Sequence, residues 1–266
     1  MVFAVIALMI GLLLGAVQKA RHSALRISSM NNLKQIGLAT CLYTEQTTTF
    51  PVAHDSNEHD SVFVAILPYL DNKAVHDHWT LENPAGRSRR TIYLGIYDSP
   101  ADPSPILSAG PSSYACVGPV ILLEWGLKPA EILDGTSQTA VYVERYKSSC
   151  GRPDYWTQYL YDADRYKILP TGIGRGASVA YKTNGDAYPV PSGTPGVSRS
   201  SIPGVTFQLA PTLAECDSRA AQSPHRSGML AAMADGSVRT LGPGMSEAGY
   251  MALLTPNWGD TAGETW

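Results

Sequence analysis

The N-terminal run of apolar residues constrains this chain more than any other feature. Residues 2–17 read VFAVIALMIGLLLGAV and contain no charged or polar side chain. As a helix the run would rise about 24 Å, short of the roughly 30 Å hydrocarbon core of a membrane. No positive charge precedes it, as a secretory signal would require. Helices that are apolar on every side are rare outside lipid or large cores, so we expect a membrane or assembly segment.

The residues after this run predict that the same helix continues to about residue 46. No proline occurs between residues 18 and 46, and Gly37 is the one glycine there. Small or apolar residues recur at steps of three and four, at Ala20, Ala24, Ile27, Met30, Leu33 and Gly37. This spacing predicts an amphipathic second half that docks on the chain's own domain. The first half would then carry the assembly or membrane surface, at Val2, Ile6, Met9, Leu13 and Val17.

Composition argues against several classes of function. The net charge is −3, and the densest basic cluster is Arg87, Arg89 and Arg90, so nucleic acid is not an expected partner. Low charge together with 24 Gly and 19 Pro favours strands and loops over helix bundles. The cysteines form no CxxC pair, which argues against a zinc knuckle. The four cysteines, Cys41, Cys116, Cys150 and Cys216, are consistent with one or two disulfides and equally with free thiols.

The sequence near the C-terminus predicts a β-hairpin. Residues 228–234 are apolar or small, residues 237–241 alternate, and Asp235-Gly236 lies between them. Asp-Gly between two strands favours a type I′ turn, in which both central residues have positive φ. We therefore interpret Asp235 and Gly236 as turn formers and His225, just before the first strand, as a hydrogen-bonding or packing histidine.

A second turn cluster precedes a predicted strand at residues 139–143. It consists of Asp134, Gly135, Thr136 and Ser137. Asp134 is a candidate Ca²⁺ ligand, but the acidic spacing of an EF-hand is missing, and a turn role is the preferred interpretation. His76 and His78 would share one face of a strand, but a helix or loop is equally consistent with residues 74–79, and we interpret them as a surface pair. No cofactor is expected.

Several motifs together resemble the DUF1559 family of pilin-like proteins, which have a prepilin-type N-terminus and a C-terminal H-x9-DG motif. In chain order the motifs are AVQKARHSALRISSMNNLKQIGLAT at 16–40, Phe50-Pro51, ILPYL at 66–70, SPADP at 99–103, Ser113-Tyr114, ILDGTSQT at 132–139, Glu144, and His225 separated by nine residues from Asp235-Gly236. Each motif alone is weak. Their order and spacing carry the resemblance.

The resemblance implies an α+β, pilin-like fold, in which a long N-terminal helix packs on an antiparallel β-sheet head with long loops. We expect residues 1–46 to form the membrane or assembly helix and 47–266 the head, with 170–204 as an inserted Gly/Pro-rich loop. The family begins with a basic leader, a Gly cleavage site and a Phe-Thr-Leu-Ile-Glu-like start, whereas this sequence starts inside the apolar segment. We expect a truncated or misassigned start; an unprocessed member is the alternative.

Two serines stand where the family often has cysteines, one just before NNLKQIG and one at the start of C-P-S-D-P. They are Ser29 and Ser99. Because both cysteines are absent together, the resemblance implies that they pair in other members, and that this bridge between helix and head is missing here.

The resemblance also implies the function: a non-enzymatic pilin-like or pseudopilin-like subunit, anchored in the membrane before assembly into a filament or secretion apparatus. Homo-oligomeric or filament partners are expected, with the head extracytoplasmic at the inner membrane or in an extracellular filament. The positive-inside rule would instead keep Lys19, Arg21, Arg26 and Lys34 in the cytoplasm, and we follow the resemblance.

Two other functions were weighed. One is a membrane-anchored module that binds carbohydrate or protein through the aromatic residues Tyr155, Trp156, Tyr159, Tyr161 and Tyr166. The other is a hydrolase using His225 with Asp235 or Asp134, for which GxSxG, HExxH and nucleotide-binding motifs are all missing.

Overall fold

The computed structural model describes residues 2–51, 62–82, 92–105, 112–117, 127–149, 152–153, 159–162, 167–170, 207–216, 220–257 and 259. Some sequence predictions lie outside these residues. They concern Arg87, Arg89 and Arg90, Cys150, Tyr155, Trp156, Tyr166 and residues 171–204.

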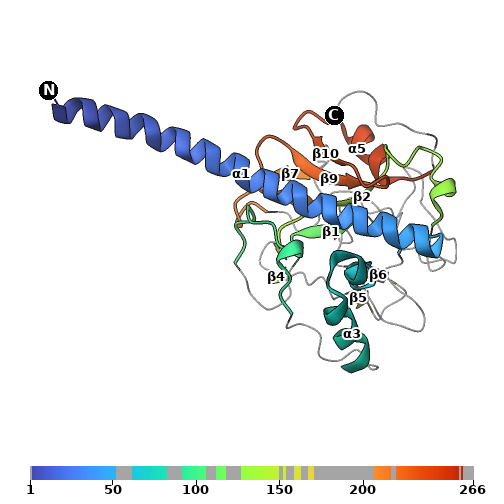
Figure 1. Cartoon of the computed structure of the whole chain (residues 1–266). Helices are drawn as coiled ribbons and strands as arrows, with labels where there is room; N and C mark the ends of the chain where they lie inside the picture. Colours follow the sequence, from blue (N-terminus) through green and yellow to red (C-terminus); the bar gives the residue numbers. More distant parts are fainter. Residues whose placement is uncertain are drawn as a thin grey trace.

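A single helix, α1 (Val2–Thr47), runs from the N-terminus across the rest of the molecule. Its first half projects beyond the remainder of the chain, which we call the head, and its second half lies against the head (Figure 1). Residues 2–24 are all exposed, and Ser29 is the first buried residue of the helix. The expected long N-terminal helix is thereby confirmed.

The central sheet of the head is antiparallel, with strand order β1-β2-β9-β10. The strands are β1 (Tyr114–Cys116), β2 (Ala140–Glu144), β9 (Met229–Met233) and β10 (Val238–Leu241). Every residue of β2 and β9 is buried. Strands covered on both faces read as continuous apolar runs, which accounts for AVYV and MLAAM. With α1, this sheet confirms the predicted α+β class.

The face that α1 presents to the head was only partly predicted. Leu33 and Gly37 are buried as expected, but Ile27 is 58% exposed, and Ala20 and Ala24 are exposed too. The prediction failed there because Arg26, and not Ile27, joins this part of α1 to the head, and because the contact face includes polar residues. The buried positions are Ser29, Leu33, Ile36, Gly37, Ala39, Thr40 and Thr44.

The hairpin β9–β10 is confirmed, but its predicted type I′ turn is wrong. Gly236 has φ 75°, whereas Asp235 does not have a positive φ. The Gly236 N–H donates to the Met233 carbonyl at 2.9 Å, and the Met233 N–H donates to the Ser237 carbonyl at 2.8 Å. The loop therefore holds three residues, Ala234 to Gly236, with glycine in the left-handed position. This is the usual alternative to a two-residue hairpin loop.

Shorter elements complete the head. They are α2 (Val62–Ala65), η1 (Leu67–Leu70), α3 (Lys73–Glu82), η2 (Gly95–Tyr97), η3 (Pro129–Glu131) and α5 (Glu247–Leu254). Three two-stranded pairs are β3 (Ser148–Ser149) with β4 (Arg152–Pro153), β5 (Tyr159–Asp162) with β6 (Lys167–Pro170), and the parallel β7 (Phe207–Leu209) with β8 (Ala221–Ser223). Because α3 is a helix, His76 and His78, two positions apart, do not share a face.

Candidate functional site

The buried carboxylate of Glu144 lies at the centre of the junction between α1 and the head. Glu144 is 0% exposed, at the end of β2. Its Oε1 accepts a hydrogen bond from Ser29 Oγ of α1 at 2.9 Å. Its Oε2 accepts from Ser223 Oγ at 2.6 Å and from the Leu230 N–H at 2.9 Å. One side chain thus joins α1, β2, β8 and β9, and its desolvation is compensated by these donors.

Ser29 links this carboxylate to two further parts of the head. The Tyr114 hydroxyl of β1 lies 3.0 Å from Ser29 Oγ, and Ser99 Oγ donates to the same oxygen at 3.2 Å. Ser29 and Ser99, the two residues at the family's cysteine positions, are therefore neighbours across the junction. Burial raises the pKa of Tyr114 far above its usual range, so its phenol stays neutral.

His225 belongs to the Glu144 cluster and not to either aspartate considered from sequence. Its side chain is 8% exposed, and its Nε2 lies 3.4 Å from Glu144 Oε1 without meeting hydrogen-bond geometry. Asp235 Oδ1 instead accepts from the Ser237 N–H at 2.8 Å. Asp134 Oδ1 accepts from the Gly259 N–H at 2.7 Å. Asp235 therefore stabilises its own turn, whereas Asp134 binds a backbone N–H 125 residues away, near the C-terminus.

The Asp235-Gly236 turn packs directly against α1. Lys34 Nζ donates to the Gly236 carbonyl at 2.7 Å. A Cβ added to Gly37 would lie 3.3 Å from Gly236 Cα, tighter than an ordinary contact, so any larger residue at position 37 would push α1 away from the turn. Gly236 is favoured at its own position by its positive φ. Further along α1, Arg26 donates to the Gly228 carbonyl and to Thr240 Oγ1, each at 2.9 Å. The C-terminal hairpin is therefore the main surface on which α1 docks.

A family model described as "Protein of unknown function (DUF1559)" matches residues 18–116 and 86–242, which together span most of the chain. The chain belongs to the DUF1559 family. Comparison with curated proteins and with solved structures gave no match. Several of the motifs that carry the DUF1559 resemblance meet in space, since Ser29, Ser99, Tyr114, Glu144 and His225 lie in one buried cluster where α1 meets the head.

The SPADP motif of this DUF1559 protein forms a second polar cluster beside the first. Lys147 Nζ lies 2.9 Å from Asp98 Oδ1, with the two side chains 7% and 11% exposed. Asp102 Oδ2 accepts from the Lys147 N–H at 2.7 Å and from Ser113 Oγ at 2.8 Å. Burial raises the pKa of Asp102, and the hydrogen bonds it accepts partly oppose that rise. The cluster holds the Asp98 carbonyl where Asn32 of α1 donates to it at 3.1 Å.

The remaining candidates have structural contacts. Gly135 has φ 97°, and the Thr136 carbonyl accepts from the Asp235 N–H at 3.1 Å, which joins the two turn motifs.

Within the described residues, no three His, Cys, Asp or Glu side chains cluster as metal ligands. Cys41 and Cys116 are free thiols, and Cys216 is disulfide-bonded. The sequence analysis did not predict that Glu144 lies at the centre of the junction. The feature that could have indicated this is the position of an acidic residue at the end of an otherwise apolar strand.

Proposed function

We propose that this DUF1559 protein is a pilin-like or pseudopilin-like structural subunit, anchored in a membrane before it assembles into a filament or secretion apparatus. One observation carries the proposal. α1 is long and apolar enough to cross a membrane, and none of its most apolar 18-residue stretch is buried against the chain's own head. Leu12, Leu13 and Leu14 are each more than 60% exposed. A surface of this kind requires lipid or other protein around it.

The same apolar surface suits both states of such a subunit. In the membrane, lipid covers it; in a filament, the helices of neighbouring subunits would cover it, at roughly 25 cal/mol per Å² of apolar area removed from water. Identical subunits that associate head-to-tail without closing a ring form helical filaments. The docked half of α1 then fixes each head at a constant position relative to its own anchor.

Two of the four basic residues after the apolar run support an extracytoplasmic head. Arg26 and Lys34 hydrogen-bond to backbone carbonyls of the head, so their charges serve docking. Lys19 and Arg21 alone then remain as topology signals among the four, which weakens the positive-inside argument for a cytoplasmic head.

We further propose that the role is non-enzymatic. The imidazole of His225 lies against a carboxylate that α1 itself covers, and the fold uses Asp134 and Asp235 in turns. The alternative of an anchored binding module rests on aromatic residues for which the structure describes at most the backbone, at Tyr159 and Tyr161 in β5.

The test places one charge in each half of α1. Leu13→Lys puts an ammonium in the middle of the apolar run, and Leu42→Lys puts one on the solvent side of the docked half, where Leu42 is 49% exposed. Leu13→Lys should move most of the protein out of the carbonate-resistant membrane fraction and abolish filaments in electron micrographs, whereas Leu42→Lys should do neither. Normal anchoring and filaments in Leu13→Lys would overturn the proposal.

A further inference from the structure

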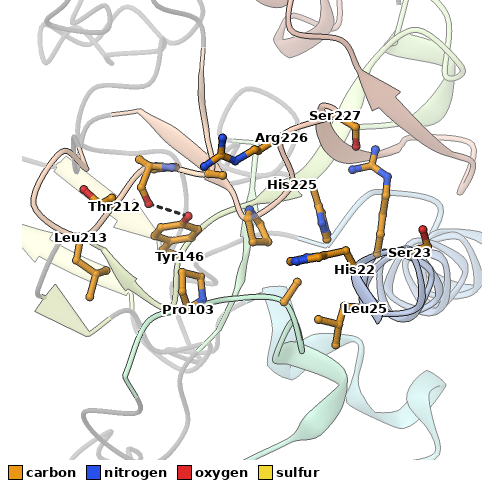
Figure 2. Close-up of a pocket in the computed structure, with 15 residues that line it drawn as sticks. His22, Ser23, Leu25, Pro103, Tyr146, Thr212, Leu213, His225, Arg226 and Ser227 are labelled. Atoms are coloured by element: carbon orange, nitrogen blue, oxygen red, sulfur yellow. Dashed lines mark hydrogen bonds between the residues drawn. The ribbon is translucent and has the colours of Figure 1, made fainter. Parts of the chain in front are cut away.

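A pocket of about 690 Å³ lies where the exposed half of α1 leaves the head. His22, Ser23, Leu25 and Arg26 of α1 form one side, and the rest is formed by Tyr146 and by residues from loops at 101–103, 210–213 and 224–227. In Figure 2, His22 and Leu25 lie on the α1 side, and Thr212 and Leu213 lie on the opposite side. The pocket is therefore built jointly by α1 and the head, and it exists only while α1 is docked.

The charged residues that line the pocket are both arginines, Arg26 and Arg226, and the histidines His22 and His225 lie beside them. None of the described lining residues is Asp or Glu; the Glu144 carboxylate lies behind the lining, 3.4 Å from His225 Nε2, and is buried. Ser23, Thr212 and Ser227 add hydroxyl groups, and the rest of the lining is mostly proline and apolar side chains. Convergent donors on largely apolar walls suit an anionic group attached to an apolar body. Guanidinium groups match the oxygens of phosphate particularly well.

Two basic residues of the pocket are held in position by the rest of the fold. The His225 ring belongs to the pocket lining, and its buried Nε2 faces Glu144, whose Oε1 lies 3.4 Å away. Arg26 is held at the pocket by its bonds to the Gly228 carbonyl and Thr240 Oγ1. Side chains that are fixed before a ligand arrives lower the entropic cost of binding it.

The distance of the pocket from the apolar run of α1 indicates which ligand it binds. His22 follows Val17 by five residues, so it lies about 7.5 Å further along the helix axis. The headgroup layer beyond each face of the hydrocarbon core is roughly 5–8 Å thick. With the apolar run in the hydrocarbon core, His22 at the membrane-proximal end of the pocket is level with the lipid phosphates, and the backbone of Arg26 lies four residues, about 6 Å, further from the core. We propose that this pocket binds the phosphate group of an anionic phospholipid. This inference rests on the membrane anchoring proposed above.

The test uses the full chain in zwitterionic detergent micelles, titrated with phosphatidylglycerol or phosphatidylcholine and followed by native mass spectrometry. Phosphatidylglycerol should bind at least tenfold more tightly than phosphatidylcholine. The double variant His22→Gln/Arg226→Gln should lose that preference. Both residues line the pocket and are exposed, so the variant should fold. Arg21→Gln is the matched control, because it removes a charge at the same height from an α1 residue outside the pocket.

Each other outcome contradicts the proposal in its own way. Equal binding of the two lipids would exclude an anion site. Equal losses in Arg21→Gln and in the pocket variant would indicate diffuse attraction to surface charge. Displacement of phosphatidylglycerol by inorganic phosphate at similar concentration would assign the site to free phosphate, and displacement by an acidic peptide would assign it to a protein partner. Carbonate extraction of the wild type in parallel separates these results from a failure of anchoring itself.

Discussion

The two halves of α1 share one backbone conformation and face opposite surroundings. In the first half Leu13 is 62% exposed, and nothing lies within 4 Å of a Cβ added to Gly11. In the second half Leu33 is 0% exposed, and a Cβ on Gly37 would meet Gly236. Helical continuity therefore says nothing about where a helix passes from one environment to another. That boundary is set by distant residues, above all Glu144 and the β9–β10 turn.

The largest effect should come from removing the carboxylate that joins the docked half to three strands. Glu144→Ala leaves Ser29, Ser223 and the Leu230 N–H without their acceptor, and loss of buried partners of this kind costs roughly 3–5 kcal/mol. The free energy of unfolding by denaturant in micelles measures it. Glu45→Ala, at an exposed position of α1, should change stability by less than about 0.5 kcal/mol. Equal effects of the two variants would mean that the cluster does not hold α1.

A covalent bond across the junction should sharpen the difference between the halves. In Ser29→Cys/Ser99→Cys the new thiols replace oxygens that lie 3.2 Å apart, so a disulfide should form under oxidising conditions. Such a bond typically stabilises by about 2–4 kcal/mol. Hydrogen exchange should slow in the docked half and stay unchanged in residues 2–24. Ser28→Cys/Ser99→Cys, with Ser28 exposed, should not cross-link; efficient cross-linking there would contradict the geometry of the junction.

A matched pair of glycine substitutions compares the halves directly. Gly37→Leu forces α1 away from the β9–β10 turn, and overpacking of this kind costs about 1–3 kcal/mol. Gly11→Leu meets open space and adds a better helix former, so it should leave the head as stable as in the wild type. Thermal unfolding of both variants in micelles measures the difference, and a neutral Gly37→Leu would show that the close approach is dispensable.

The smallest effect concerns acid. Because burial raises the pKa of Asp102 in the folded state, the native protein holds this proton more tightly than the unfolded chain. The resulting stabilisation is complete below the unfolded pKa of about 3.9 and is lost as pH rises through the folded pKa. The stability of the wild type relative to Asp102→Asn should therefore fall as pH rises across that window. Unfolding measured at a series of pH values tests the sign; a rising difference would contradict it.

Local patterns predicted α1, β2 and the β9–β10 hairpin because each rests on residues close in sequence. The three-residue loop was missed because Asp-Gly is compatible with two hairpin geometries that differ in where the strands stop pairing. The exposure of Ile27 was missed because a hydrophobic stripe does not report where the head ends. The role of Glu144 was missed because its donors come from residues 79 to 115 positions away. The adjacency of Ser29 and Ser99 followed from the family pattern rather than from local chemistry.

The docking of α1 on the C-terminal hairpin has a consequence for how the protein is made. Arg26 and Lys34 bind carbonyls 202 residues further along the chain, so α1 cannot complete its contacts with the head until those residues have been synthesised. Until then the docking half of α1 lacks its partner, while the exposed apolar half needs no other part of the chain in order to enter lipid. In the proposed membrane-anchored state, insertion can therefore precede closure of the head, and a nascent chain that stops before Met229 would lack the hairpin that holds α1.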